Sequence, residues 1–288
     1  MKVTKAVIVA AGWGTRMLPA SKVVPKELLP VVDVPAIQLV VEEVAACGIR
    51  DVIVVVAPGR SQVLDHFRAA PELERYLAER GKRDLLKLVR RPAELANVRS
   101  VLQEKALGLG HAVLQARDAA GDEPFALLLP DDIFAAPRPC LAQILETAQQ
   151  KGAPAVALTR VARSEVSKYG IVRAEPAGPR TYRLSGMVEK PEPETAPSDL
   201  AIVGRYILPP EIFPLLADVR PGAGGEIQLT DALARLSATR PVYGCQFEGE
   251  RFDVGDRLGF LRAQIAFALR RPELAEGLRG MLRSFISS

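Results

Sequence analysis

The sequence predicts an α/β protein with a doubly wound, mostly parallel but mixed central sheet flanked by helices, in a Rossmann-like arrangement. Three near-continuous apolar runs, at residues 6–11, 51–57 and 125–130, are typical of parallel strands that are buried on both faces. Between the first two runs, residues 37–45 carry apolar side chains at helical spacing, and Gly48 follows as a stop signal. A strand, a helix and a strand in this order form a βαβ unit, which predicts helices on both faces of a sheet.

The rest of the chain continues the alternation of strands and helices. Residues 62–91 are charged and helical in pattern, and they predict an inserted helical hairpin. We expect further strands at 155–161, 186–190 and 200–208, and further helices at 111–120, 226–236 and 257–270. Because no low-complexity linker divides the chain, residues 1–288 are predicted to form one domain that carries the insertion. The glycines of residues 221–225 are typical of a mobile lid or a tight turn.

Composition and charge argue against several classes of protein. Of the 288 residues, 48% are hydrophobic and 25% are charged, as in ordinary globular proteins. The net charge of +4 is mild, and the densest cationic cluster, residues 80–91, lacks the interleaved aromatic residues of a nucleic-acid site. A solvated helix face is therefore the favoured interpretation of this cluster, and we predict no nucleic-acid partner. No apolar run approaches the roughly 18 residues of a membrane helix, so we predict no membrane partner either.

The cysteines and the N-terminus favour a cytoplasmic protein. Cys47, Cys140 and Cys245 lie far apart without a C-x-x-C pair, which argues against a disulfide framework or a structural zinc site and favours a reducing compartment. The first apolar run continues directly into a glycine-rich loop, as a first strand does and a signal peptide does not.

That loop, GWGTRMLPASKVVPK at residues 12–26, matches neither of two common nucleotide-binding motifs. Met17 occupies the position of the third glycine in the dinucleotide fingerprint G-x-G-x-x-G, and the chain has no G-K-[ST] of a P-loop. In addition, Pro19, Pro25 and Pro30 exclude the long helix that follows such loops. A dehydrogenase is thereby excluded.

The loop instead combines a glycine turn with a cationic arm. Gly12 and Gly14 stand at the carboxyl end of the first strand, where open α/β sheets bind ligands, and glycine lets backbone N–H groups approach a nucleotide closely. We expect an extended, proline-stiffened arm to follow and to present Arg16, Lys22 and Lys26 to phosphates.

The complete pattern G-x-G-T-R-x-x-P-x-[ST]-K-x-x-P-K resembles the signature of the sugar-1-phosphate nucleotidyltransferases. Within that family the chain is most similar to the bacterial enzymes that join UTP and glucose 1-phosphate into UDP-glucose and pyrophosphate. Further blocks agree in order, namely Q-x-x-x-x-GLGHAV (103–113), LPDD (129–132), YGIV (169–172), VEKP (188–191), LAIVGRYIL (200–208), GEIQLTDAL (225–233) and DVGDRLG (253–259). The resemblance implies nucleotidyltransferase architecture, a Mg²⁺ cofactor and a homodimer or homotetramer.

The implied reaction brings two anions together, so catalysis is expected mainly from charge neutralisation and in-line positioning. By resemblance, Arg16 and Lys26 are the catalytic cations that serve the triphosphate. Asp131 follows an apolar strand directly, and its spacing alone is equally compatible with a turn or capping acid. The resemblance implies that Asp131 and Asp253 are the magnesium ligands.

The resemblance also implies a site for the sugar phosphate. Lys190 is expected to hold the phosphate, and Glu189 to accept hydrogen bonds from the glucose hydroxyl groups. Asp132 is expected nearer the sugar than the metal, and Gly170 is expected to let the backbone approach the hexose.

Recognition of uracil requires partners for an N3–H donor and its flanking carbonyl groups. Gln103 offers a donor and an acceptor on one planar amide. His111 begins a helix, and we expect it to have a packing or capping role and not an acid–base role. By resemblance, the remaining nucleotide-binding residues are Ala11, Gly12, Gly14, Glu27 and Gly108.

Two alternatives stay open at this point. Thymidylyl transfer from dTTP differs by one methyl and one hydroxyl group, which a pocket separates only modestly unless the hydroxyl is bonded. A non-catalytic sugar-nucleotide-binding regulatory protein could share the fold, although such a protein would be free to lose the phosphate and metal ligands that this chain retains.

Overall fold

A nine-stranded mixed sheet forms the centre of the molecule in the computed structural model, which describes residues 1–222 and 225–286. The strand order is β5-β4-β1-β6-β11-β8-β12-β10-β9. The strands are β1 (Lys5–Ala10), β4 (Asp51–Val56), β5 (Asn97–Leu102), β6 (Phe125–Leu128), β8 (Ala155–Arg160), β9 (Gly170–Gly178), β10 (Thr181–Glu189), β11 (Leu200–Leu208) and β12 (Val242–Gln246). Residues 223–224, within the predicted lid or turn, lie outside the described residues.

Parallel pairing is concentrated in one half of the sheet. Strands β5, β4, β1 and β6 run parallel, so their carboxyl ends share one edge. Strand β11 is antiparallel to both β6 and β8, while β10 is antiparallel to both β12 and β9. Strand β9 also pairs with β11, through Ile171 and Ala201. The α/β class with a mixed sheet is confirmed, but the sheet is not mostly parallel as predicted. Four of its pairings are parallel, including that of β12 with β8, and five are antiparallel, because β11 and β10 run opposite to the strands beside them.

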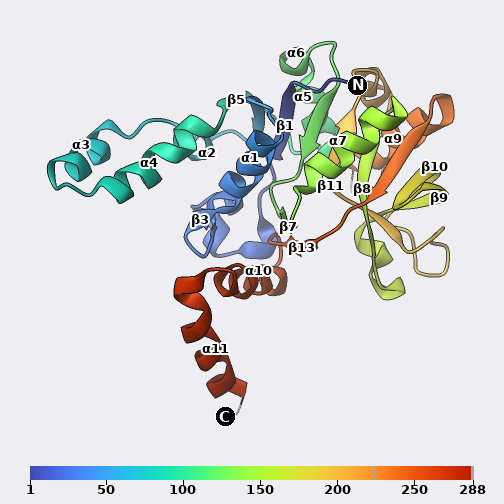
Figure 1. Cartoon of the computed structure of the whole chain (residues 1–288). Coiled ribbons are helices and arrows are strands. Elements are labelled where there is room, and N and C mark those ends of the chain that lie inside the picture. Colours follow the sequence, from blue (N-terminus) through green and yellow to red (C-terminus); the bar gives the residue numbers. More distant parts are fainter. Residues whose placement is uncertain (223–224, 287–288) are drawn as a thin grey trace.

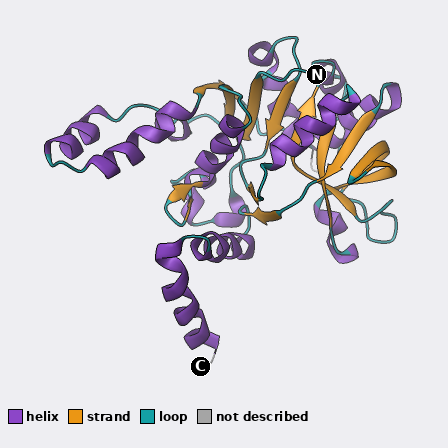
Figure 2. Ribbon diagram, in the orientation of Figure 1, coloured by secondary structure: helices purple, strands orange, loops and turns teal. Residues whose placement is uncertain are grey.

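Helices cover both faces of the sheet, as a doubly wound fold requires (Figure 2). One core lies under α1 (Ala36–Ala46), α7 (Cys140–Lys151) and α10 (Arg257–Leu269). The other lies under α5 (Leu109–Gln115), α6 (Arg117–Ala120), α8 (Ile212–Ala217) and α9 (Leu229–Thr239). Consecutive residues of β1 enter different cores, Val7 the second and Ile8 the first, because side chains alternate along a strand.

The predicted helical insertion consists of α2 (Gln62–Asp65), α3 (Pro71–Glu79) and α4 (Arg83–Leu95). Helices α3 and α4 form a hairpin that projects from the sheet (Figure 1). Helix α4 continues past the predicted boundary to Leu95, with Pro92 buried inside it. Helix α4 contacts α1, and Arg91 of α4 donates from its Nε to Glu42 Oε1 of α1 at 3.0 Å. The strands of the central sheet come from the chain between Lys5 and Gln246, and the single domain stays a prediction.

The proline-containing arm after β1 is not extended, contrary to our expectation. It forms three single 3₁₀ turns, at Thr15–Met17, Ala20–Lys22 and Lys26–Leu28. A single turn needs few backbone N–H donors, so the prolines fit between the turns. The predicted exclusion of a long helix here is confirmed.

Short pairings complete the structure. Strand β7 (Asp132–Ala135) pairs antiparallel with β13 (Glu250–Asp253), and Asp132 lies opposite Asp253. The remaining elements are β2 (Pro30–Val31), β3 (Val34–Pro35), a 3₁₀ helix at Arg163–Lys168 and α11 (Pro272–Ile286). Within the described ranges, no helix has the length and apolar character needed to cross a membrane.

Candidate active site

A polar cleft of about 1260 Å³ opens beside the carboxyl end of β6. Its walls come from several elements that are distant in sequence, including the arm after β1, the segment after β6, and strands β9, β10 and β13. Its lining includes these predicted site residues: Arg16, Asp131, Asp132, Gly170, Glu189, Lys190 and Asp253. Arg16 and the metal and sugar residues named from the sequence are thus found around one space, whereas Lys26 is not among its lining residues.

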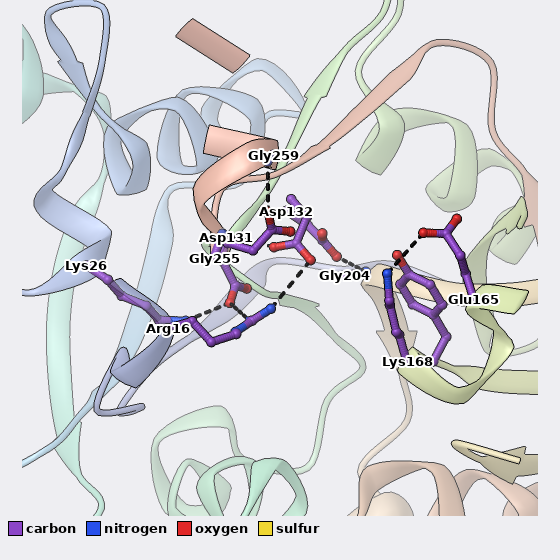
Figure 3. Close-up of polar contacts among 12 residues, drawn as sticks. Arg16, Lys26, Asp131, Asp132, Glu165, Lys168, Gly204, Gly255 and Gly259 are labelled. Carbon is purple, nitrogen blue, oxygen red and sulfur yellow. Dashed lines mark hydrogen bonds and ion pairs between the residues drawn. The ribbon is translucent and has the colours of Figure 1, made fainter. Parts of the chain in front are cut away.

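Two cations converge on two carboxylates at one end of the cleft (Figure 3). The Lys26 ammonium donates a hydrogen bond to Asp131 Oδ2 at 2.6 Å. The Arg16 guanidinium lies 3.9 Å from Asp131 Oδ2 and 3.9 Å from Asp253 Oδ2. The side chain of Lys26 is 15% exposed and that of Arg16 is 59% exposed. Lys26 is therefore held in place, whereas Arg16 faces the open cleft.

Backbone pairing brings the two carboxylates together. Asp131 follows β6, and its carbonyl oxygen accepts a hydrogen bond from the Val254 N–H at 2.8 Å. The β7–β13 ladder places Asp132 opposite Asp253, next to this bond. The carboxylates of Asp131 and Asp253 are therefore neighbours because of main-chain contacts.

Burial and neighbouring charges set the ionisation of this cluster. Burial alone would lower the pKa of Lys26, but Asp131 and Glu27 raise it above its ordinary value. Burial alone would raise the pKa of Asp131, but Lys26 holds it below its ordinary value. Burial, together with the charge of Asp132, raises the pKa of Asp253. The Lys26–Asp131 pair thus stays ionised, and Asp253 is the carboxylate whose charge a bound cation would favour most.

The two carboxylates and Arg16 meet beside Gly255. A Cβ atom at this position would lie 3.0 Å from Asp131 Oδ2, 3.0 Å from Asp253 Oδ1 and 2.8 Å from Arg16 Nη2. Across the part of the chain that the structure describes, no group of three or more His, Cys, Asp or Glu side chains is gathered around a metal position. Two carboxylates at an open cleft fit Mg²⁺, which takes its other ligands from phosphate oxygens and water.

Arg251 is a site residue that the sequence analysis missed. Its Nε donates to Asp132 Oδ1 at 2.6 Å, its Nη1 donates to the Tyr169 hydroxyl at 3.2 Å, and its Nη2 lies 3.7 Å from Asp253 Oδ2. The other oxygen of Asp132 accepts from the Gly204 N–H at 2.8 Å. Both oxygens of Asp132 are thus engaged by the protein. The position of Arg251 two residues before Asp253, on the same face of a strand, was the available signal.

A buried cation supports the turn that carries Asp131. The Arg205 side chain is only 1% exposed and donates to Glu43 Oε2 at 2.7 Å. It also donates to the carbonyl oxygens of Leu129, at 3.1 Å, and Asp132, at 3.0 Å. These two carbonyl groups flank Asp131 in the chain, so Arg205 fixes the turn from beneath.

The predicted sugar-phosphate residues lie at the end of β10. Glu189 is the last residue of this strand, opposite Gly170 of β9. Lys190 follows with φ at 46°, a left-handed conformation that is uncommon for a residue with a side chain. Its N–H donates to the Tyr169 carbonyl oxygen at 2.9 Å. The turn lets two consecutive side chains, Glu189 and Lys190, line the same cleft.

The predicted nucleotide residues lie along the neighbouring sheet edge. Ala11, Gly12 and Gly14 follow β1, and Gln103 follows β5, at the carboxyl ends of parallel strands. Gly14 has φ at 67°, and a Cβ there would lie 3.2 Å from the Cβ of Lys26. A glycine at this position therefore allows the loop to pack against Lys26.

The amide of Gln103 is oriented by its neighbours. Its Nε2 contacts the Gly108 carbonyl oxygen at 3.2 Å and His111 Nδ1 at 2.9 Å. His111 Nε2 lies 3.3 Å from the amide nitrogen of Gln115. Burial lowers the pKa of His111, so the ring is neutral at pH 7 and bound to amides on both sides. This arrangement agrees with the packing role that we expected for the histidine.

Glu27 is the most unusual of the predicted residues. It is 3% exposed, and its Oε1 is buried without a hydrogen-bond partner among the described residues. The nearest cation is the Lys26 ammonium, at 4.0 Å from that oxygen. Burial raises the pKa of Glu27 to about 7, and Lys26 opposes this shift.

Comparison with known proteins places these features in context. The family described as Nucleotidyl transferase matches residues 5–268. The chain is 47% identical over 277 residues to a UTP–glucose-1-phosphate uridylyltransferase of Staphylococcus saprophyticus, covering 96% of each chain. A UTP-bound UGPase from Acinetobacter baumannii superimposes with a TM-score of 0.90 at 37% identity, over 98% of this chain and 99% of that one. A UDP-glucose pyrophosphorylase solved with UDP-glucose has a TM-score of 0.86 at 38% identity, over 94% and 100% of the two chains.

Proposed function

Because the chain belongs to the Nucleotidyl transferase family, we propose that it transfers a uridylyl group from UTP to glucose 1-phosphate and releases UDP-glucose and pyrophosphate. The observation that carries this proposal is the Lys26–Asp131–Arg16 cluster, in a chain that is similar over nearly its whole length to enzymes named for this reaction. The protein is thus an enzyme, and a purely regulatory role is not needed to explain it.

The main difficulty of this reaction is electrostatic. The phosphate of the sugar must attack the α-phosphorus of a triphosphate in line, and two unit charges about 4 Å apart repel by about 1 kcal/mol even in bulk water. We assign the neutralisation of this charge to Lys26 and Arg16. Lys26 is fixed by Asp131, whereas the exposed guanidinium of Arg16 is free to follow the phosphates. Charge placed in advance in this way acts without reorganisation during the reaction.

We further propose that Asp131 and Asp253 hold Mg²⁺ beside Gly255. When bound, the ion would neutralise charge on the triphosphate and the leaving pyrophosphate. The protein residues position the carboxylates: Arg205 supports the turn of Asp131, and Arg251 lies against Asp253.

The remaining roles are assigned by position along the cleft. Lys190 is proposed to bind the sugar phosphate and Glu189 the hexose hydroxyl groups, with Gly170 beside them. Asp132 is proposed to shape the hexose end through its bonds to Arg251 and the Gly204 N–H. The proposed nucleotide-binding residues are Ala11, Gly12, Gly14, Glu27, Gln103 and Gly108.

Two broader proposals concern the state of the protein. Its three cysteines are free thiols, which supports a reducing, cytoplasmic location. The family resemblance supports a homodimer or homotetramer, which light scattering of the purified protein would test.

The decisive experiment measures Mg²⁺-dependent release of pyrophosphate from UTP and glucose 1-phosphate, with dTTP as the competing nucleotide. We expect turnover with UTP to exceed that with dTTP. The Lys26→Ala variant should lose about 10²- to 10³-fold in kcat, because it removes one fixed charge from the reacting phosphates. Lys82→Ala is the control, since Lys82 is an exposed cation of the helical insertion and does not line the cleft. Preference for dTTP, or an unaffected Lys26→Ala variant, would contradict the proposal.

A further inference from the structure

Thr230 contacts the residue that we assign to hexose recognition. Its hydroxyl donates a hydrogen bond to Glu189 Oε2 at 2.6 Å. Thr230 is 8% exposed, is the second residue of α9, and lines the cleft. The bond therefore joins two segments of the cleft wall that are far apart in sequence.

The two oxygens of the Glu189 carboxylate have different surroundings. Oε2 accepts the bond from Thr230, whereas Oε1 lies 3.5 Å from the Lys190 ammonium. A terminal carboxylate rotates within a broad torsional well, so a free glutamate would present either oxygen to a ligand in many orientations. The bond to Thr230 restricts this rotation and leaves Oε1 beside the proposed phosphate-binding lysine.

Gly170 provides the space for this contact. A Cβ atom at Gly170 would lie 2.9 Å from Thr230 Oγ1 and 3.2 Å from Glu189 Oε2. Gly170 and Glu189 are also paired residues of β9 and β10. A residue with a side chain at this position would push the hydroxyl and the carboxylate apart, which gives the glycine a second function beyond access of the backbone to the sugar.

We propose that Thr230 is a positioning residue for the sugar substrate. Its hydroxyl orients the Glu189 carboxylate so that this carboxylate accepts hydrogen bonds from hexose hydroxyl groups while Lys190 holds the phosphate. This inference rests on the proposed function of Glu189. It explains why a threonine at the start of α9, in the segment GEIQLTDAL, belongs to the site although it carries no charge.

The test compares two substitutions that differ in whether they keep the hydroxyl group. Thr230→Val keeps the shape but removes the donor, and Thr230→Ser keeps the donor. A hydrogen bond to a charged group accounts for roughly a tenfold change in binding, so Thr230→Val should raise KM for glucose 1-phosphate about tenfold. KM for UTP should stay within about twofold of the wild-type value. Thr230→Ser should restore KM for glucose 1-phosphate to within about threefold, and thermal unfolding confirms that both variants fold.

A double-mutant cycle separates this inference from the function on which it rests. If Thr230 acts through Glu189, then adding Thr230→Val to Glu189→Ala should change KM for glucose 1-phosphate by less than about twofold. An equal effect of Thr230→Val in both backgrounds, or failure of serine to restore KM, would overturn the positioning role. If Glu189→Ala leaves that KM unchanged, the proposed role of Glu189 is wrong and the inference about Thr230 is overturned with it.

Discussion

Replacement of Glu27 by glutamine is predicted to remove a pH-dependent loss of stability. The carboxyl group is 3% exposed, one of its oxygens has no hydrogen-bond partner among the described residues, and burial raises its pKa to about 7. Glutamine has nearly the same shape, but its amide does not ionise. The substitution therefore isolates the free energy of placing this charge inside the protein.

The magnitude and sign follow from the two pKa values. The folded protein keeps the Glu27 proton up to about pH 7, whereas the unfolded chain releases it near 4.5. The stability contributed by the protonated carboxyl is fully present below pH 4.5 and is lost as the pH rises through 7. Since one pKa unit corresponds to about 1.4 kcal/mol, the wild-type protein should lose about 2–3 kcal/mol relative to Glu27→Gln between pH 5 and pH 8.

The assay is urea-induced unfolding of both proteins at pH 5 and pH 8, in buffers of equal ionic strength. The difference in unfolding free energy between the two proteins should change by about 2–3 kcal/mol across this range. Glu104→Gln is the control, because Glu104 is exposed and its substitution should have no such effect. If the difference for Glu27→Gln is the same at both pH values, the buried carboxyl ionises normally and the argument from its burial is refuted.

Three further predictions concern the support of the site. Gly255→Ala places a Cβ 3.0 Å from oxygens of both proposed metal ligands. The Mg²⁺ concentration for half-maximal activity should therefore rise about 10- to 100-fold. An unchanged Mg²⁺ titration would contradict the proposed position of the ion. Arg205→Met leaves the Glu43 carboxylate buried without its cation and should lower the unfolding free energy by about 3–5 kcal/mol. Adding Glu43→Met should recover part of this loss. If urea unfolding shows no recovery, the broken ion pair is not the cause of the loss. Gly108 has a φ of 96°, and Gly108→Ala places a Cβ 2.7–2.9 Å from atoms of residues 226–227. KM for UTP should therefore rise more than KM for glucose 1-phosphate. An equal rise in both would contradict the proposed role of Gly108 in nucleotide binding.

The buried strands of the fold were predictable because burial on both faces leaves a continuous apolar run. Strand β11 has the predicted bounds, 200–208, and all of its residues are buried. Strand β5, at the sheet edge, was missed because its residues, 97–102, are mostly exposed or half-buried and mixed in polarity. Strand β12 was missed as well, since its five residues carry too short a pattern to distinguish it from a loop.

The site was predictable where chemistry follows local sequence, and less so where it depends on packing. Asp131 could be placed at the sheet edge because it directly follows an apolar strand. Arg251 could not be identified, because its partners, Asp132 and Tyr169, come from segments that only the folded chain brings together. The compact turns of the cationic arm were missed for a related reason: prolines exclude a long helix but do not distinguish an extended arm from single 3₁₀ turns. The binding role of each residue remains a prediction for the experiments above.

The pairing of β7 with β13 has a consequence for the order of events during protein synthesis. Asp131 is made well before Asp253, the other proposed metal ligand, which is added more than 100 residues later. Strand β12, an internal strand of the sheet, is added only just before Asp253. Strands β1, β4, β5 and β6 can associate while translation continues, whereas the two carboxylates cannot meet until the chain has been made past residue 253. Chains that end before residue 253 therefore cannot form the carboxylate pair proposed to bind the metal, so this part of the site is completed only late in synthesis.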